Sequence, residues 1–306
     1  MKIVTIIGGS GFVGKSYLDA YNKGFLNKFK INRINIICRN PKKISLTITK
    51  SSNINLIKGD ISTLKSIPKS DLIIYAADKA NLSKLKNHKN FLSKSKKSIN
   101  NFCKIIKKMK HTKILYISSG SIYKYKKKNL FKEKKLTDRS LYTYIKYYSE
   151  DKIIKLKKYQ IKTSIARCFT FVGRWLPRNE QFAIGNFIND GLNKKDIRVK
   201  SNSRTIRSYM FSDDLAFWLT KIGFYSKIKT QIFDIGSDKP IEIHNLAKLI
   251  GKIFKKNIIF NNNKLGQVDK YLPNIKKAKE HLKLKITYDL KKAILLTIKE
   301  INDQTY

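Results

Sequence analysis

The order of apolar segments along the chain predicts an α/β fold built on a doubly wound parallel sheet. The chain opens with a nearly continuous apolar segment, Lys2–Ile7, which is typical of a parallel strand buried on both faces. A cluster of glycines follows directly at Gly8–Gly14. Up to about Cys168, short apolar segments then alternate with amphipathic ones, as a parallel sheet covered by helices requires.

Each element of the first half follows from its own pattern. Strands are expected where four to eight apolar residues are bounded by polar residues, and helices where apolar residues recur at helical spacing. The predicted strands are Lys2–Ile7, Arg33–Cys38, Ile54–Ile57, Asp71–Tyr75 and Lys113–Ser118. The predicted helices are Phe12–Asn27, Leu92–Met109 and Leu141–Lys158.

The alternation loosens in the second half. Helices are predicted at Gln181–Leu192, Ile243–Phe254 and Leu290–Ile301, and short strands at Ile197–Val199 and Gln231–Ile235. The sequence shows neither an internal repeat nor a Pro- or Ser-rich linker. We therefore expect residues 1–170 to form the sheet domain, and residues 171–306 to form mainly a smaller lobe, with some segments returning to the first domain.

The charge is strongly positive: 66 Lys and Arg against 21 Asp and Glu give +45 over 306 residues. Such an excess suggests nucleic-acid binding. However, Lys outnumbers Arg by 57 to 9 and Ile outnumbers Val by 45 to 5, which is typical of an A/T-rich genome. The lysines are also spread along the whole chain, so genome composition is the favoured explanation. The nine arginines become candidates for positions that need a planar, bidentate cation.

Several classes of protein are excluded by composition. No apolar run approaches the ~20 residues that span a bilayer, and the N-terminus shows no signal-peptide pattern. Cys38, Cys103 and Cys168 are too few and too scattered for a disulfide framework or a zinc site, and the four His lie far apart. We expect a soluble, cytoplasmic, reduced protein without a metal.

The glycine cluster predicts a dinucleotide-binding loop. It fits both Gly9-x-Gly11-x-x-Gly14 and Gly8-x-x-Gly11-x-x-Gly14. Both patterns place backbone N–H groups and a helix N-terminus against a pyrophosphate, where a side chain would block the approach. The cofactor-binding residues expected here are Gly8, Gly11, Phe12, Val13 and Gly14.

Two further positions bear on the cofactor. The second predicted strand ends in Arg39 rather than in the acid that accepts hydrogen bonds from the ribose of NAD, so NADP is mildly favoured over NAD. The alternative is that Arg39 is an exposed loop residue of a basic protein and has no role in cofactor binding. Asp60, after the third strand, can accept a hydrogen bond from an adenine amino group or cap a helix beginning near Ile61.

A tyrosine and a lysine four residues apart form the candidate catalytic pair. Tyr142 and Lys146 share one face of a predicted helix. A neighbouring ammonium and a positive nicotinamide ring would lower the phenol pKa from its usual value near 10 and favour a phenolate base. Ser119, near the end of the fifth strand, can hydrogen-bond the same substrate oxygen. With 16 Tyr and 57 Lys the spacing alone is weak, and its place after the fifth strand strengthens it.

Together these segments resemble the extended short-chain dehydrogenase/reductase superfamily, and within it the NAD-dependent epimerase/dehydratase (nucleotide-sugar) family. The resemblance covers nearly the whole chain. The segments similar to family motifs are Ile117–Tyr123 (SSxxVY), Tyr142–Glu150 (YxxSKxxxE), Ala166–Gly173 (LRxxNxxG), Arg207–Ala216 (RDYxxVxDLA), Phe233–Ser237 (YNVGS) and Tyr271–Asn274. The resemblance implies a Rossmann-like, doubly wound parallel sheet with a smaller C-terminal α/β substrate lobe.

The resemblance also implies roles for individual residues. Tyr142 would be the catalytic base, Lys146 its partner and ribose ligand, and Ser119 the third hydroxyl group. The residues that would hold the dinucleotide are Gly8, Gly11, Gly14 and Asp60, with Ala76 and Ala77 beside its nicotinamide half.

On the substrate side, Arg207 would grip the diphosphate of a sugar nucleotide, since a fork-shaped guanidinium suits a diphosphate. A structural ion pair with Asp213 or Asp214 is the alternative. Asn186 would contact the diphosphate or the sugar.

The departures from the family pattern narrow the expected reaction. Gly120-Ser121 stands where 4,6-dehydratases carry Asp-Glu, so water elimination is disfavoured. Thr170 and Ser95 replace two asparagines usual in the family.

We expect a nucleotide-sugar epimerase, with C4 as the expected carbon, that acts by transient hydride transfer to a bound nicotinamide cofactor and serves polysaccharide biosynthesis. The alternatives are an NADPH-dependent 4-ketoreductase of a nucleotide-linked deoxysugar and, in another class, a non-catalytic RNA-binding or assembly factor. The resemblance further implies a homodimer through the helices near 92–109 and 141–158.

Overall fold

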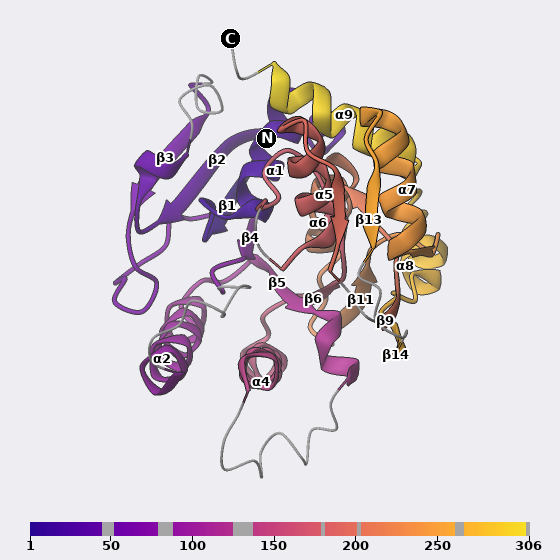
Figure 1. Ribbon diagram of the computed structural model, residues 1–306. Coiled ribbons are helices and arrows are strands. Elements are labelled where there is room, and N and C mark those ends of the chain that lie inside the picture. The colour runs from indigo at the N-terminus through magenta and orange to yellow at the C-terminus, as the bar shows by residue number, and fades with distance from the viewer. Residues whose placement is uncertain are drawn as a thin grey trace. The chain divides into compact units, whose positions relative to one another are not determined.

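The computed structural model describes residues 1–44, 52–78, 88–124, 137–178, 181–200, 203–260 and 266–303, and Figure 1 shows its helices and strands. The chain divides into two compact units. Unit 1 comprises Met1–Cys168 and Ala216–Asp234, and unit 2 comprises Phe169–Leu215 and Ile235–Tyr306.

Unit 1 is built on a seven-stranded sheet of order β11-β6-β5-β4-β1-β2-β3. Its strands are β1 (Lys2–Ile7), β2 (Ile31–Cys38), β3 (Ile54–Lys58), β4 (Leu72–Tyr75), β5 (Lys113–Ser119), β6 (Thr163–Cys168) and β11 (Gln231–Ile235). From β3 to β6 all neighbouring strands pair in parallel. The strand order reverses between β1 and β4, which is the point where doubly wound sheets bind ligands. The predicted Rossmann-like fold class is confirmed.

Helices α1 (Phe12–Asn22) and α6 (Ser212–Phe224) pack on one face of this sheet. Thr220 of α6 donates a hydrogen bond of 2.9 Å to the Tyr17 hydroxyl of α1. Gly223 of α6 approaches β4 so closely that a Cβ there would come within 2.7 Å of the Leu72 side chain. Close helix–sheet packing therefore explains the glycine in the last turn of α6.

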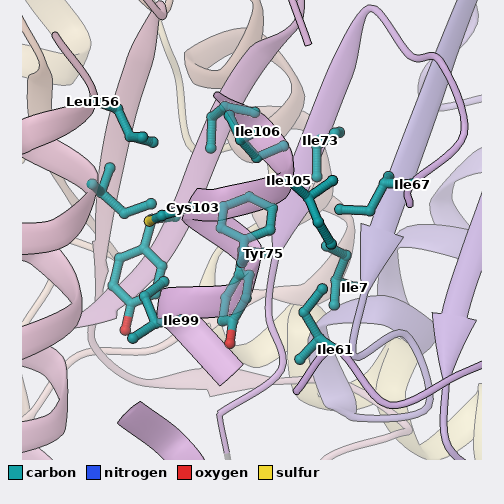
Figure 2. Close-up of a cluster of buried hydrophobic side chains, with 14 of the residues drawn as sticks. Ile7, Ile61, Ile67, Ile73, Tyr75, Ile99, Cys103, Ile105, Ile106 and Leu156 are labelled. Carbon is teal, nitrogen blue, oxygen red and sulfur yellow. The ribbon is translucent and has the colours of Figure 1, made fainter. Parts of the chain in front are cut away.

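The opposite face is covered by α2 (His88–Ile106) and α4 (Asp138–Lys155), which lie beside each other in Figure 1. Tyr75 of β4 packs against Phe102 of α2, with ring centroids 4.8 Å apart, and against Tyr116 of β5 at 5.7 Å. Figure 2 shows Ile99 and Ile106 of α2 around Tyr75. Burial of one such side chain contributes about 1.5–3 kcal/mol. This core fixes α2 and the carboxyl ends of β4 and β5, where the site lies.

Short 3-10 turns complete unit 1 at Asn27–Phe29, Pro41–Lys43, Gly120–Lys124 and Leu156–Tyr159.

Unit 2 combines short strand pairs with four helices in the part of the chain that the structure describes. Its strands are β7 (Phe171–Val172), β8 (Ile197–Val199), β9 (Ser203–Arg207), β10 (Met210–Phe211), β12 (Ile241–Glu242), β13 (Ile258–Phe260) and β14 (Gly266–Lys270). They pair as β10-β7, β13-β8 and β12-β9-β14. The helices are α5 (Ala183–Leu192), α7 (Ile243–Phe254), α8 (Lys276–Leu282) and α9 (Leu290–Asn302).

Two of the predicted helix boundaries differ from those in the structure because of the local backbone conformation. The first helix ends at Asn22 rather than at Asn27, because Gly24 has a φ of +74° and turns the chain away. The residues from Ile61 form a turn and not a helix. No helix within the described ranges has both the length and the hydrophobicity that crossing a membrane requires.

Candidate active site

The turn after β1 uses its glycines in two ways. Gly8 has a φ of +86°, and a Cβ there would lie 2.5 Å from the Cα of Ala77 and 2.6 Å from the carbonyl oxygen of Ala76. A Cβ on Gly14 would collide with the backbone of Gly9. Both glycines are therefore required by close packing of the protein's own backbone.

Gly11 is different. It precedes α1 with an extended backbone (φ −86°, ψ −179°) and makes no side-chain cap. Among the described residues, a Cβ on Gly11 would meet the carbonyl oxygen of Gly8, at an ordinary 3.5 Å. A side chain thus fits the fold at this position but would cover the start of α1, at Phe12 and Val13, where a helix N-terminus attracts an anion. The cradle fits the pyrophosphate of a dinucleotide.

The other predicted cofactor residues lie around the same edge of the sheet. Ala76 continues β4 and donates its backbone N–H to the carbonyl oxygen of Ile7 at 2.8 Å. Asp60 accepts hydrogen bonds from the backbone N–H and hydroxyl of Ser62 at 3.0 and 2.8 Å, and pairs with Lys94 at 2.9 Å. Although burial opposes it, these partners lower the pKa of Asp60 to about 2. Arg39, directly after β2, has an exposed side chain.

The predicted catalytic residues come together in unit 1. Helix α4 starts with the Thr137 side chain accepting a hydrogen bond from the backbone N–H of Ser140 at 3.3 Å. One and two turns further on, it presents Tyr142 and Lys146, and the Lys146 Nζ lies 5.5 Å from the centre of the Tyr142 ring. Ser119, the last residue of β5, is hydrogen-bonded to the Tyr142 phenol.

Burial raises the pKa of Tyr142 above its ordinary value. The nearby Lys146 charge and the Ser119 hydrogen bond act in the opposite direction, as expected from the sequence, but they do not outweigh burial. Phenolate formation at neutral pH therefore needs more positive charge than Lys146 alone supplies.

Asp78 belongs to this cluster although it is not among the residues predicted from the sequence. Its Oδ2 lies 2.8 Å from the Lys146 Nζ and accepts a hydrogen bond of 2.7 Å from the Tyr116 hydroxyl. Lys146 also donates to the carbonyl oxygen of Ile117 at 2.7 Å. The signal was present in the sequence, since Asp78 is an acidic residue at the carboxyl end of a strand that borders the glycine turn.

The turn that follows Ser119 is braced by a network within unit 1. Arg167 of β6 binds Glu150 of α4 through two hydrogen bonds, of 3.0 and 2.8 Å. The Arg167 guanidinium lies 4.9 Å from the centre of the Tyr123 ring, and the Tyr123 hydroxyl donates to Asp234 of β11 at 2.9 Å. The bidentate role expected of the rare arginines is found here.

In unit 2, Arg207 pairs with neither Asp213 nor Asp214. Its guanidinium binds the Asp269 carboxylate at 2.5 Å and the Asp269 carbonyl oxygen at 2.7 Å. Asp214 instead accepts hydrogen bonds from the backbone N–H groups of Thr287 and Tyr288, at 3.0 and 3.3 Å. The suggested partner was wrong because Asp269, on the neighbouring strand β14, lies 62 residues further along the chain.

Asn186 lies in the first turn of α5. Among the described residues, no group of three or more His, Cys, Asp or Glu side chains could hold a metal ion.

Comparison with models of protein families identifies the family to which the chain belongs. Residues 4–236 match the model of the NAD dependent epimerase/dehydratase family. The chain belongs to this family. It is therefore an enzyme of the extended short-chain dehydrogenase/reductase type, and the family predicted from the sequence motifs is confirmed.

Proteins similar to this chain in sequence or in fold include enzymes that are named for UDP-sugars. UDP-glucuronic acid decarboxylase 2 of Arabidopsis thaliana is 24% identical over 148 residues, which are 48% of this chain and 33% of that protein. The match thus spans a third of the length of this curated relative.

Solved structures of the fold superpose over nearly the whole chain. The complex of Bordetella bronchiseptica WbmF with NAD+ and UDP has a TM-score of 0.79 at 16% identity, covering 99% of this chain and 93% of that one. The UDP-glucuronic acid 4-epimerase of Bacillus cereus, in complex with UDP-glucuronic acid and NAD, has a TM-score of 0.78 at 18% identity, covering 99% and 100%. At these identities the likeness demonstrates the common fold.

The cluster in this family member offers a definite set of chemical groups. Tyr142 and Ser119 supply two hydroxyls that converge on one place, and Lys146 supplies a cation beside them. Once Tyr142 is ionised, the arrangement can accept a proton from a substrate hydroxyl and can stabilise the resulting oxygen by hydrogen bonding.

Proposed function

We propose that the protein is a nucleotide-sugar 4-epimerase with Tyr142 as its catalytic base. The convergence of Tyr142, Ser119 and Lys146 beside the glycine turn, in a chain of the epimerase/dehydratase family, carries this proposal. Gly120-Ser121 adds support, because no carboxylate pair follows Ser119 to catalyse the loss of water.

In the proposed mechanism, Tyr142 removes the proton from the C4 hydroxyl of the sugar. Ser119 donates a hydrogen bond to the same oxygen, and the ammonium of Lys146 stabilises the phenolate. A bound nicotinamide dinucleotide would supply the hydride acceptor and donor at C4. After the sugar has turned in the site, Tyr142 returns the proton to the C4 oxygen.

We propose that unit 1 holds the dinucleotide at Gly8, Gly11, Phe12, Val13 and Gly14. Asp60 would lie toward the adenosine half and Ala76 and Ala77 toward the nicotinamide half. Exposed Arg39 supports NADP, whereas the NAD+ bound to WbmF and the NAD bound to the Bacillus cereus epimerase support NAD.

Unit 2 is the proposed substrate lobe. Arg207 and Asn186 would bind the diphosphate of the sugar nucleotide. The ion pair with Asp269 fixes the planar guanidinium of Arg207, whose side chain is 18% exposed. The UDP and UDP-glucuronic acid in the solved complexes support a UDP-sugar.

A homodimer through α2 and α4 is also part of the proposal. These helices carry an aromatic and cationic face, on which the Lys96 Nζ lies 5.0 and 5.3 Å from the ring centres of Tyr144 and Tyr148. Light scattering on the purified protein measures the oligomeric state directly, and a monomer would contradict the proposal.

The second candidate function is an NADPH-dependent 4-ketoreductase of a nucleotide-linked deoxysugar, which Arg39 favours. It would use the same three catalytic residues. The two functions differ in whether the cofactor leaves after each turnover.

One experiment separates the two candidates. The purified protein is denatured, and the released nicotinamide nucleotide is identified by mass spectrometry. The folded protein is then incubated with UDP-glucose, UDP-galactose, UDP-glucuronic acid and a UDP-4-keto-deoxysugar. Epimerisation without added cofactor supports the epimerase. Stoichiometric NADPH consumption with the keto sugar supports the reductase, and failure to bind or contain any nicotinamide nucleotide would contradict both.

A further inference from the structure

We propose that Asp78 is a positioning residue of the proposed catalytic cluster. It is the buried counter-ion that fixes the position of the Lys146 amine beside Tyr142 and keeps this amine protonated. The kinetic part of this inference rests on the proposed role of Tyr142 as the base. Its structural part, the charge state of Lys146, does not.

The sheet places Asp78 in the cluster. It follows Ala76-Ala77 at the carboxyl end of β4, and β4 pairs with β5 so that Tyr75 lies opposite Tyr116. The Tyr116 hydroxyl donates to Asp78 at 2.7 Å, and 8% of the Asp78 side chain is exposed. The hydrogen bond from Tyr116 of β5 therefore positions the Asp78 carboxylate independently of Lys146.

Lys146 is held by two acceptors that belong to the sheet. Its Nζ donates to Asp78 at 2.8 Å and to the carbonyl oxygen of Ile117 at 2.7 Å. An ammonium has three donors, so two of them direct the third. The side chain of Lys146 is 4% exposed, and a buried ammonium without a counter-ion tends to lose its proton.

The charge of the cluster is set by few groups. Burial raises the pKa values of Tyr75 and Tyr116, and it raises that of Cys168 to about 12, so all three are neutral at physiological pH. The acidic groups that act on these three neighbours are Asp60 on Tyr75, Asp78 on both tyrosines, and Asp234 on Cys168. Within the described part of the chain, the charged groups that act on Tyr142 are therefore Asp78 and Lys146.

The two charges act on each other and on Tyr142. Burial alone would lower the pKa of Lys146, but Asp78, followed by Tyr142, outweighs burial and raises it. Asp78 also raises the pKa of Tyr142, against the effect of Lys146. Removing the carboxylate should therefore make the first proton leave the Tyr142–Lys146 pair at a lower pH.

Removal of the Asp78 carboxylate should also change the reaction rate. If the first proton comes from Lys146, the pair is left as a Tyr142 phenol beside a neutral Lys146 amine, which is inactive. This state holds the same number of protons as the active state, a Tyr142 phenolate beside a Lys146 ammonium. Raising the pH does not convert one into the other, so the maximal rate falls at every pH. A purely structural role of Asp78 would lower the rate without moving the pH profile.

The kinetic test compares pH profiles of kcat/KM for wild type, Asp78→Asn and Asp78→Glu. In Asp78→Asn we expect the acid limb to move down by about one pH unit and the plateau to fall by about tenfold or more. Asp78→Glu keeps the charge and should keep the wild-type acid limb, with a lower rate. The matched control is Asp151→Asn, which breaks the exposed Asp151–Lys155 pair on the same helix and should leave the profile unchanged.

A second measurement needs no substrate. The protein is labelled with 13C at the lysine ε-carbon, the Lys146 signal is assigned with Lys146→Met, and its protonation is followed by NMR against pH. In wild type we expect Lys146 to keep its proton up to a higher pH than an ordinary lysine, and in Asp78→Asn we expect the proton to be lost at a clearly lower pH than in wild type.

The outcomes are separable. An unchanged acid limb together with an unchanged Lys146 titration in Asp78→Asn would overturn the inference. If Asp78→Asn does not fold, loss of the Lys146 proton below pH 8 in wild type, or a displaced acid limb in Asp78→Glu, would overturn it. If wild type converts no sugar nucleotide, the proposed function fails while the NMR titration still tests Asp78.

Discussion

Glu150 and Arg167 form a two-point ion pair in which both carboxylate oxygens face the guanidinium, at 3.0 Å from Nε and 2.8 Å from a terminal nitrogen. The pair joins α4, the helix that carries Tyr142, to β6. Through the Tyr123 ring it also reaches the turn that follows Ser119. The geometry of the two proposed catalytic hydroxyls, those of Tyr142 and Ser119, therefore depends on a contact outside the cluster itself.

We expect Glu150→Gln to lower the free energy of unfolding by about 2 kcal/mol, because one charged hydrogen bond to Arg167 is lost inside the protein. Arg167→Lys should cost a similar amount, since an ammonium cannot bind both oxygens in this geometry. Urea denaturation of the two variants and of the double variant measures the coupling. Additive effects, with no coupling energy, would contradict the role given to the pair.

The glycine turn provides a prediction that separates folding from cofactor binding. Gly14→Ala should destabilise the protein by about 2 kcal/mol, because its Cβ collides with the backbone of Gly9. Gly11→Ala should leave stability within about 0.5 kcal/mol of wild type and weaken nicotinamide dinucleotide binding about tenfold or more. Thermal melts and isothermal titration measure the two effects. Unimpaired cofactor binding by Gly11→Ala would show that α1 does not receive the pyrophosphate.

Asp60 provides a prediction for stability at low pH. Its folded-state pKa of about 2 lies below the ordinary 3.8, so ionised Asp60 stabilises the fold above pH 4. This contribution should disappear as the pH falls from 4 towards 2. Asp60→Asn should therefore lose less stability than wild type over that interval. Parallel curves for the two proteins in urea denaturation would contradict the bonds assigned to Asp60.

Much of the fold follows from local sequence. The buried strands of the sheet are short, nearly continuous apolar segments, and the glycine turn directly follows the first of them. The second half was harder, because short strands such as β9 and β14 are defined by partners distant in the sequence. The three-stranded sheet that contains Arg207 was not predicted for this reason.

In the candidate site, too, local sequence predicts some contacts, while others depend on residues that are distant in the sequence. The motif spacing predicted the approach of Tyr142, Lys146 and Ser119. The acidic residue at the carboxyl end of β4 marks Asp78 as a candidate, but the motif spacing does not reveal its contact with Lys146, because that contact depends on how β4 and β5 lie against α4. It also could not predict that burial would outweigh Lys146 in setting the pKa of Tyr142.

The most direct test of the central claim is the rate of C4 epimerisation by Tyr142→Phe, measured by NMR on whichever UDP-sugar wild type converts. Phenylalanine keeps the ring in its half-buried place and removes the hydroxyl, so cofactor content and thermal stability should stay close to wild type. We predict that the rate falls by about a thousandfold or more. A variant that is folded, loaded with cofactor and still converts the sugar at the wild-type rate would contradict the account.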